Sequence, residues 1–114
     1  IAVNVSIKDW SQSIPVEIKR ISNPIPVSFR RDIQPILTKA ACNSGGCHGK
    51  AEGQNGFKLS VFAFDDSFDH DSITRHARGR RINIAAPDTS LLLRKATGTI
   101  PHGGGRKVPT DGLW

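Results

Sequence analysis

Two cysteines that lie five positions apart, with a histidine directly after the second, restrict this 114-residue chain more than any other feature. They form the segment Cys42-Asn43-Ser44-Gly45-Gly46-Cys47-His48, a C-x4-C-H motif. A disulfide across so short a loop would add little stability, and it would leave the histidine without a role. A zinc site needs four ligands and the chain has no third cysteine, while an iron–sulfur cluster needs more ligands of the right kind than are present.

Covalent attachment of haem c would use all three side chains of the motif. In the related C-x-x-C-H signature two thiols bind the haem vinyl groups, and the adjacent histidine binds the iron. Two further residues between Cys42 and Cys47 lengthen the loop without changing the step from Cys47 to His48. The motif therefore favours one covalently attached haem c over a disulfide or a zinc site, which stay open as alternatives.

The segments on both sides of the motif predict three short helices. The first is expected over about 32–40, with Asp32 as its N-cap and Pro35 in its first turn. The second is expected from 69 or 71 to 78, and the third from 91 to 95 or 96. Glycine-rich loops separate these helices, and long loops in a small domain usually need something besides side chains to pack on.

The first residues of the chain have a different pattern from the rest. Residues 1–8 alternate between apolar and polar side chains, which is the period of a half-buried strand. A turn is expected at 11–13, followed by a second short strand that contains Val16, Ile18 and Ile21. Residues 57–61 also alternate, and they predict one further extended segment.

Two prolines, Pro24 and Pro26, predict an extended linker after the strands. We therefore expect a β-strand arm, or the end of an upstream β domain, with a Pro-rich linker over 1–27, and the haem domain over 28–114. The chain lacks a starting methionine and a signal sequence, which predicts a processed chain or an excised domain.

The candidates for the second axial ligand of the iron are few, because the chain contains no methionine. The common pairing of histidine with methionine is excluded, which leaves His70, His76, His102 or an open or water-bound position. His70 and His76 fall on or beside a predicted helix of alternating charge, where a histidine is more often a surface residue. His102 lies in a proline- and glycine-containing loop that can approach a porphyrin face. We therefore expect His48 and His102 to be the metal ligands.

Further residues are expected around the haem. Candidates for its apolar wall are Phe29, Phe57, Leu59, Phe62, Leu91, Leu92 and Ile100. Candidates for pairing with its propionates are Arg80, Arg81 and Arg106.

The order of these motifs resembles the planctomycete-type cytochrome c domain over about residues 28–107. The segments that carry the resemblance are Ser28-Phe29-Arg30-Arg31-Asp32-Ile33-Gln34-Pro35-Ile36-Leu37, Cys42 through Cys47-His48-Gly49, Gly56-Phe57-Lys58-Leu59-Ser60, Gly79-Arg80-Arg81-Ile82, Pro87 to Ser90-Leu91-Leu92-Leu93, and Pro101-His102-Gly103-Gly104-Gly105. The resemblance implies a c-type haem module of large secreted or envelope proteins, often with an immunoglobulin-like β domain just upstream, and it agrees with His102 as a ligand. Residues 108–114 depart from the helical ending usual in that family.

We therefore expect a mainly α fold: a small cytochrome c-like domain of about three short helices, with long loops around a haem and a short β-strand arm before it. With histidine on both sides, the iron has no open position, which favours electron transfer at a low reduction potential. The chain is then an electron carrier and not an enzyme, whatever the activity of a larger parent protein. The alternatives are a haem sensor or enzyme with an open or displaceable sixth site, and a non-haem zinc-binding or disulfide-stapled module.

The charge of the chain bears on its partners. Sixteen Lys and Arg residues against ten Asp and Glu give a net charge of +6. No aromatic residue lies within the arginine clusters, so nucleic acid is not expected, and no apolar run approaches the ~18–20 residues of a membrane span. The expected partner is a redox protein or a neighbouring domain of a larger chain. Covalent haem attachment predicts a periplasmic, cell-surface or otherwise exported location.

Overall fold

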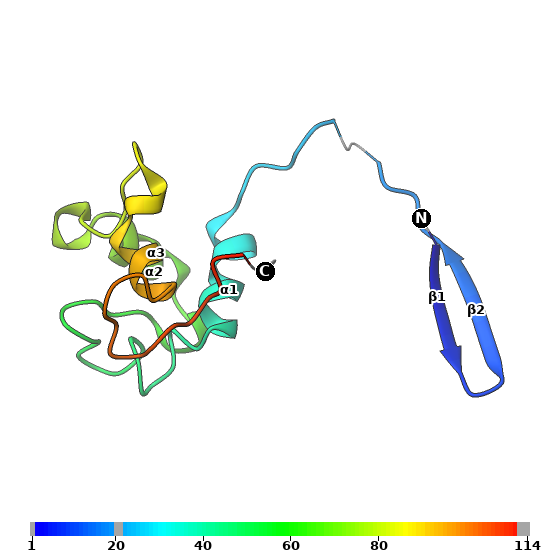
Figure 1. Ribbon diagram of the computed structural model, residues 1–114, viewed down its shortest axis with the longest axis horizontal. Coiled ribbons are helices and arrows are strands. Elements are labelled where there is room, and N and C mark those ends of the chain that lie inside the picture. Colours follow the sequence, from blue (N-terminus) through cyan, green and yellow to red (C-terminus); the bar gives the residue numbers. More distant parts are fainter. Residues whose placement is uncertain (1, 20–21, 112–114) are drawn as a thin grey trace.

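The computed structural model describes residues 2–19 and 22–111. Over these ranges the chain forms an N-terminal β-hairpin and then three short α-helices that are joined by long loops (Figure 1). The expected three helices and N-terminal strand arm are confirmed, but the fold is mixed and loop-rich, and not mainly α. Within the described ranges, no helix has the length and apolar character needed to cross a membrane.

The hairpin consists of β1 (Ala2–Ile7) and β2 (Trp10–Pro15). The α-helices are α1 (Gln34–Lys39), α2 (Asp66–Thr74) and α3 (Leu91–Ala96). Shorter helical turns are η1 (Phe29–Ile33), which is a π-helical turn, and the 3-10 turns η2 (Val61–Ala63), η3 (His76–Gly79) and η4 (Pro87–Thr89).

The second strand begins earlier than the sequence predicts. β1 and β2 pair antiparallel across a turn at residues 8–9, so the turn expected at 11–13 is wrong. Ser11 lies opposite Ser6 and therefore belongs to the polar face of the hairpin. The strand expected around Val16 and Ile18 does not form, and Ile21 lies outside the described residues.

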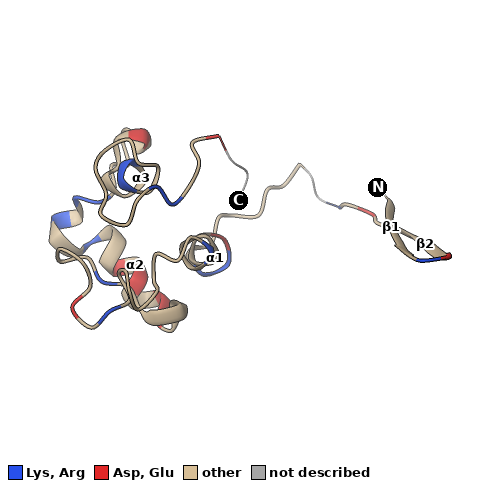
Figure 2. Cartoon of the chain, turned by 60° about the horizontal axis from the view of Figure 1, so that its bottom comes forward, with Lys and Arg blue, Asp and Glu red and all other residues tan. Residues whose placement is uncertain are grey.

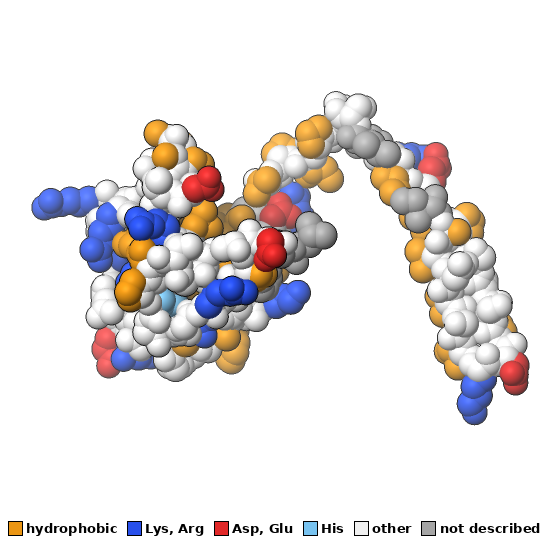
Figure 3. Space-filling view, in the orientation of Figure 1, with side chains coloured by type: hydrophobic (Ala, Val, Ile, Leu, Met, Phe, Trp, Pro, Cys, Tyr) orange, Lys and Arg blue, Asp and Glu red, His pale blue; other side chains and the backbone are white. Residues whose placement is uncertain are grey.

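The opposite face of the hairpin is apolar and exposed. Val3 lies opposite Ile14 and Ile7 lies opposite Trp10, so these four side chains share one face. Each of them is exposed, and Figure 3 shows hydrophobic side chains along this part of the chain. The cross-strand pairs specify the register of the hairpin, because a slip by one residue would exchange its two faces.

Ser28, and not Asp32, begins the first helical segment. Its hydroxyl accepts a hydrogen bond from the Arg31 amide at 3.3 Å, and its own amide donates to Asp32 Oδ2 at 2.7 Å. This reciprocal arrangement resembles a capping box and satisfies two amides that a helix start would leave unpaired. The helix therefore begins four residues before the predicted start, with η1 leading directly into α1.

The second helix is shifted towards the N-terminus relative to its prediction. Asp65 caps it, because its Oδ1 accepts from the Phe68 amide at 2.9 Å. The helix ends at Thr74 and does not reach Arg78. Ala77 and Arg78 have φ values of 54° and 61°, and an α-helix cannot contain residues in this left-handed conformation. The third helix confirms its predicted bounds. The extended segment expected at 57–61 is reduced to an isolated bridge between Gln54 and Phe57.

The apolar core is small. Its fully buried cluster consists of Leu37 from α1, Leu59 from the loop before η2, and Ile73 from α2. Packed against this cluster are the half-buried side chains of Phe29, Ile33, Cys42, Phe57, Ile82 and Leu92. Buried polar side chains are as prominent in the interior, and they comprise Gln34, Asn43, Asp69, Ser72, Arg81 and Ser90. Hydrogen bonds therefore contribute much of what joins the segments.

One buried carboxylate connects three of these segments. Asp69 of α2 is 1 % exposed and accepts hydrogen bonds from the Ser60 amide at 2.6 Å, the Ser60 hydroxyl at 2.8 Å and Gln34 Nε2 at 3.0 Å. Hydrogen bonds to an ionised acceptor are stronger than those between neutral groups. Acidic residues cluster on α2 (Figure 2), but Asp66 in its first turn keeps a side chain that is 45 % exposed.

Replacing the buried carboxylate should destabilise the domain. In Asp69→Ala, the half-buried Ser60 amide and the buried Gln34 side chain lose their acceptor, and we expect the free energy of unfolding to fall by about 3 kcal/mol. Urea denaturation followed by circular dichroism measures this change. Asp66→Ala removes the same group from a partly exposed position of the same helix, and should cost no more than about 1 kcal/mol. Equal losses in the two variants would contradict the role given to Asp69.

Candidate functional site

The end of α1 positions the first cysteine. The Cys42 amide donates to the Leu37 carbonyl at 2.8 Å, and the Ala41 amide donates to the Thr38 carbonyl at 2.9 Å. Together with the left-handed conformation of Ala41, at φ 56°, these bonds form a Schellman motif. The motif ends the helix and turns the chain directly into the cysteine loop.

The cysteine loop closes on itself between residues 42 and 49. The His48 amide donates to the Cys42 carbonyl at 3.0 Å, and the Gly49 amide donates to the Ser44 carbonyl at 3.0 Å. A Cβ atom at position 49 would overlap the backbone of Asn43, so only glycine fits there. The loop thus joins the backbone of the first cysteine to that of the histidine that follows the second.

Cys42 and Cys47 are free thiols, and both are half-buried. Burial raises the pKa of the Cys42 thiol, and the positive charge of Lys107 acts in the opposite direction. No disulfide joins Cys42 and Cys47 in this structure.

His48 and His102 lie side by side although they are far apart in the sequence. Their ring centres are 6.2 Å apart and their planes are within 6° of parallel. His48 Nδ1 lies 2.9 Å from the Phe57 carbonyl oxygen, and His102 Nδ1 lies 2.8 Å from the Gly105 carbonyl oxygen. A carbonyl can only accept, so each Nδ1 carries a proton, and Nε2 of a neutral ring then keeps a lone pair. Metal-binding histidines are oriented in this way by backbone carbonyls.

The protonation state of His48 also suits a ligand. Burial, more than any other cause, lowers the pKa of His48, and the charges of His102, Arg81 and Lys107 lower it further. The Phe57 carbonyl works against this shift but does not reverse it. His48 is therefore neutral at neutral pH, as a metal ligand must be.

The distance between the two ring centres, 6.2 Å, is compatible with one shared metal ion. Two imidazoles on opposite sides of a metal, with metal–nitrogen bonds of about 2.0 Å, would have centres roughly 6 Å apart. No group of three or more His, Cys, Asp or Glu side chains that could hold a metal occurs in the part of the chain that the structure describes. A metal held by these two histidines would need further ligands from elsewhere.

The other two candidate ligands have different neighbours. The His70 ring makes an edge contact with the Phe29 ring at 5.2 Å, and its Nδ1 lies 3.5 Å from Asp71. The His76 ring makes an edge contact with Phe68 at 5.9 Å. Both histidines are exposed, as the sequence analysis expected of surface residues.

Phe57 and Leu59 adjoin His48. The Phe57 ring centre lies 4.5 Å from that of His48, and its carbonyl accepts the His48 Nδ1 proton. The Leu59 amide donates to the His48 carbonyl at 2.8 Å, and the Leu59 side chain lies in the core. These two residues of the expected apolar wall therefore support His48 through the backbone as well as through their side chains.

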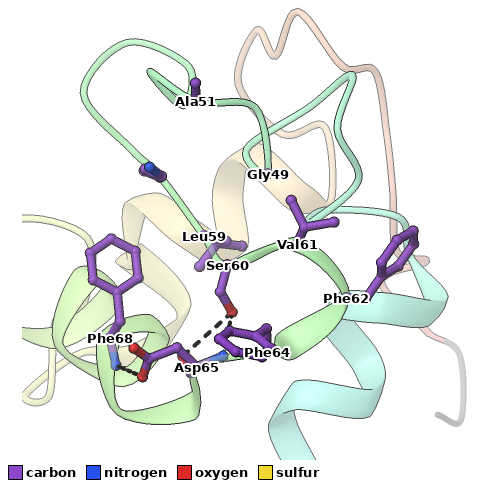
Figure 4. A pocket seen from close by; sticks show the side chains of 10 residues that line it. Gly49, Ala51, Leu59, Ser60, Val61, Phe62, Phe64, Asp65 and Phe68 are labelled. Atoms are coloured by element: carbon purple, nitrogen blue, oxygen red, sulfur yellow. Dashed lines mark hydrogen bonds between the residues drawn. The ribbon is translucent and has the colours of Figure 1, made fainter.

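The remaining wall candidates do not form one surface. Phe29 and Leu92 pack on the core, and Leu91 and Ile100 are half-buried. Phe62 is 77 % exposed and borders a surface hollow with Phe64 and Phe68 (Figure 4). Neither cysteine and none of the histidines lines this hollow, so it is separate from the histidine pair.

The three arginines proposed for propionates have different surroundings. Arg81 is 3 % exposed, and its terminal nitrogens donate to the carbonyls of Gly56, Ser72 and His76. Three of its five N–H groups therefore hold backbone, and the pairing of Arg81 with a propionate stays a prediction. Arg80 and Arg106 are exposed, and their side chains are compatible with the role predicted for them.

Lys107 belongs to the site and was not predicted. Its charge acts on both Cys42 and His48, and its Cε would lie 3.3 Å from a Cβ at Gly104. The same Cβ would lie 3.2 Å from His102 Cε1, so any larger residue at position 104 would press on both side chains. In the sequence, Arg106 and Lys107 are two adjacent basic residues, and nothing in the pattern indicates which of them faces the site.

No family model, curated protein or solved structure matches this chain. The family resemblance therefore stays a prediction, and the function has to be inferred from the residues themselves.

Proposed function

We propose that this chain is a covalent haem c-binding electron-transfer domain with a bis-histidine iron site. Residues 28–114 form the haem domain, and residues 1–27 form a β-strand arm and linker. Cys42 and Cys47 attach the haem, and His48 and His102 bind its iron. The observation that carries the proposal is the histidine pair, 6.2 Å apart with both Nδ1 atoms bonded to backbone carbonyls, next to a C-x4-C-H motif.

The small core supports a bound apolar group. Leu37, Leu59 and Ile73 are the fully buried cluster of the described residues, which is little for a domain of this size. Half-buried Cys42 and Phe57 offer further apolar surface near the histidine pair. A domain with this composition gains stability if its loops pack on something other than side chains.

The ligand set determines the role. When bound, the haem supplies a reversible one-electron couple. If His48 and His102 both held the iron, no position would be left for a substrate, which would favour electron transfer over catalysis. Imidazole donates more strongly than the thioether of methionine, so a low reduction potential is expected. Arg80, Arg81 and Arg106 remain the candidates for pairing with propionates.

The partner and location follow from this chemistry. The electron donor or acceptor would be a redox protein or a neighbouring domain of a larger chain. Covalent attachment implies a periplasmic, cell-surface or otherwise exported protein. The likeness of the motifs to planctomycete-type cytochrome c domains agrees with both statements.

A haem sensor or enzyme is the second candidate. It is favoured by the position of His102, which lies in a loop whose neighbours at 103–106 are exposed, and whose hydrogen bond goes to its own loop at Gly105. If this loop moved, His102 could leave the iron and open the sixth position.

Covalent haem is tested by mass and spectrum. The full chain, produced together with a c-type cytochrome maturation system, should gain the mass of one haem and show a low-spin c-type visible spectrum. A variant with both Cys42→Ala and Cys47→Ala should lose the covalent haem, because no thiol remains to bind the vinyl groups. A wild-type chain with bound zinc, or with a mass lowered by the two hydrogens of a disulfide, would contradict the proposal.

The sixth ligand is tested by substitution. His102→Ala should convert the low-spin six-coordinate spectrum to a high-spin one, and the reduced variant should bind carbon monoxide. His70→Ala and His76→Ala serve as matched controls and should stay low-spin. An unchanged spectrum in His102→Ala would assign the ligand to another histidine, and rapid, complete uptake of carbon monoxide by the unsubstituted protein would favour the sensor or enzyme.

A further inference from the structure

We propose that Arg81 is a positioning residue for His48. It fixes the backbone at Gly56 and Phe57 so that the Phe57 carbonyl takes the Nδ1 proton of His48 and leaves Nε2 free for the metal. The metal-binding role of His48 Nε2 rests on the proposed function. The position of the proton on His48 can be measured with or without a haem.

The contacts of Arg81 join three separate places in the chain. Its Nη2 donates to the Gly56 carbonyl at 2.7 Å, while its Nη1 donates to the Ser72 carbonyl at 2.7 Å and to the His76 carbonyl at 3.1 Å. All three acceptors are backbone atoms, so the guanidinium holds main chain. Its planar fork of donors allows it to bond the end of α2, η3 and the 54–57 turn at once.

Arg81 also reaches His48 through an aromatic ring. The guanidinium carbon lies 4.6 Å from the Phe57 ring centre, which is within the range of a cation–π contact. The ring centre of Phe57 is in turn 4.5 Å from that of His48. These three side chains form a continuous column, which we call the Arg81–Phe57–His48 column.

The segment that Arg81 contacts is a short turn at the surface. Residues 54–57 form a turn closed by two hydrogen bonds between Gln54 and Phe57, and Gly56 within it has φ 72°. Asn55 and Gly56 are exposed. The Phe57 carbonyl also accepts from the Gln54 amide at 2.9 Å, so the turn moves as a unit, and the contacts of Arg81 with the Gly56 carbonyl and the Phe57 ring fix that unit next to His48. A neutral imidazole in water prefers to carry its proton on Nε2, so His48 needs this acceptor to keep Nε2 unprotonated.

The test follows the Nδ1 proton of His48 by NMR in the full chain labelled with ¹⁵N. In Arg81→Gln, the exchange of this proton with water should speed up about tenfold, the equivalent of one buried hydrogen bond. Arg81→Lys keeps the charge but not the fork, and should show a smaller increase. Arg78→Gln removes an exposed arginine from the same segment and should leave the exchange unchanged.

The reduction potential separates positioning from charge. Loss of the positive charge alone would lower the potential, because it removes a cation that favours the reduced iron. Loss of the Nδ1 hydrogen bond makes His48 a weaker donor and raises the potential. We therefore expect the potential to rise in Arg81→Lys, where the charge is kept, and not to rise in Arg78→Gln.

Two outcomes would overturn the inference. One is a folded Arg81→Lys or Arg81→Gln protein in which the Nδ1 proton exchanges as slowly as in the unsubstituted chain. The other is an unchanged potential in Arg81→Lys. If the chain carries no haem, the proposed function fails, but a His48 protonated on Nδ1 in the unsubstituted chain, and on Nε2 in part of the Arg81→Gln molecules, would still support the role of Arg81.

Discussion

Asp69 and Arg81 are nearly inaccessible to solvent, and each satisfies three groups from other segments of the chain. Asp69 accepts from the side of α1 and from the loop that precedes η2. Arg81 donates to the end of α2, to η3 and to the turn before Phe57. Burial of a charged group without such partners would cost several kcal/mol, so both side chains restrict the arrangement of the loops around them. A domain with only a small apolar cluster is held in one arrangement largely by these two residues.

The two histidines lie on separate loops, and these loops are held in different ways. His48 follows the Schellman turn of α1 and the closed cysteine loop, and it bonds to a carbonyl that Arg81 helps to fix. His102 belongs to a loop that bonds to α3 on both sides of the histidine, while the His102 ring bonds to its own loop at Gly105. The His48 ring is therefore held by the interior, whereas the His102 ring is held by a surface loop. This difference explains why a closed electron-transfer site and a site with a displaceable ligand are both reasonable outcomes of the same arrangement.

Local sequence patterns were sufficient for the parts of the fold that depend on local interactions. The third helix matches its prediction because Pro87, Ser90 and three consecutive leucines act over one or two turns. The second helix ends early because Ala77 and Arg78 take left-handed conformations that neither residue type announces. Ser11 and Ser13 resemble a turn in the sequence, but cross-strand pairing makes them one face of a hairpin.

In the candidate site, too, some residues could be proposed from local sequence and others could not. Cys42, Cys47 and His48 are close in sequence, so their spacing alone is enough to propose a chemistry for them. His102 could be favoured over His70 and His76 because it lies in a loop and they lie on or beside a helix. The roles of Arg81 and Lys107 could not be predicted, since each is next to another basic residue and only tertiary packing determines which of the two faces inward.

The central claim is that one iron ion lies between His48 and His102 with their rings nearly parallel. Low-temperature electron paramagnetic resonance of the oxidised protein measures this directly, because the relative orientation of two axial imidazole planes determines the form of the low-spin ferric signal. The interplanar angle of 6° predicts a rhombic low-spin signal, which is typical of parallel imidazole planes. A high-spin signal, the strongly anisotropic low-spin signal of perpendicular planes, or no iron signal would contradict the account.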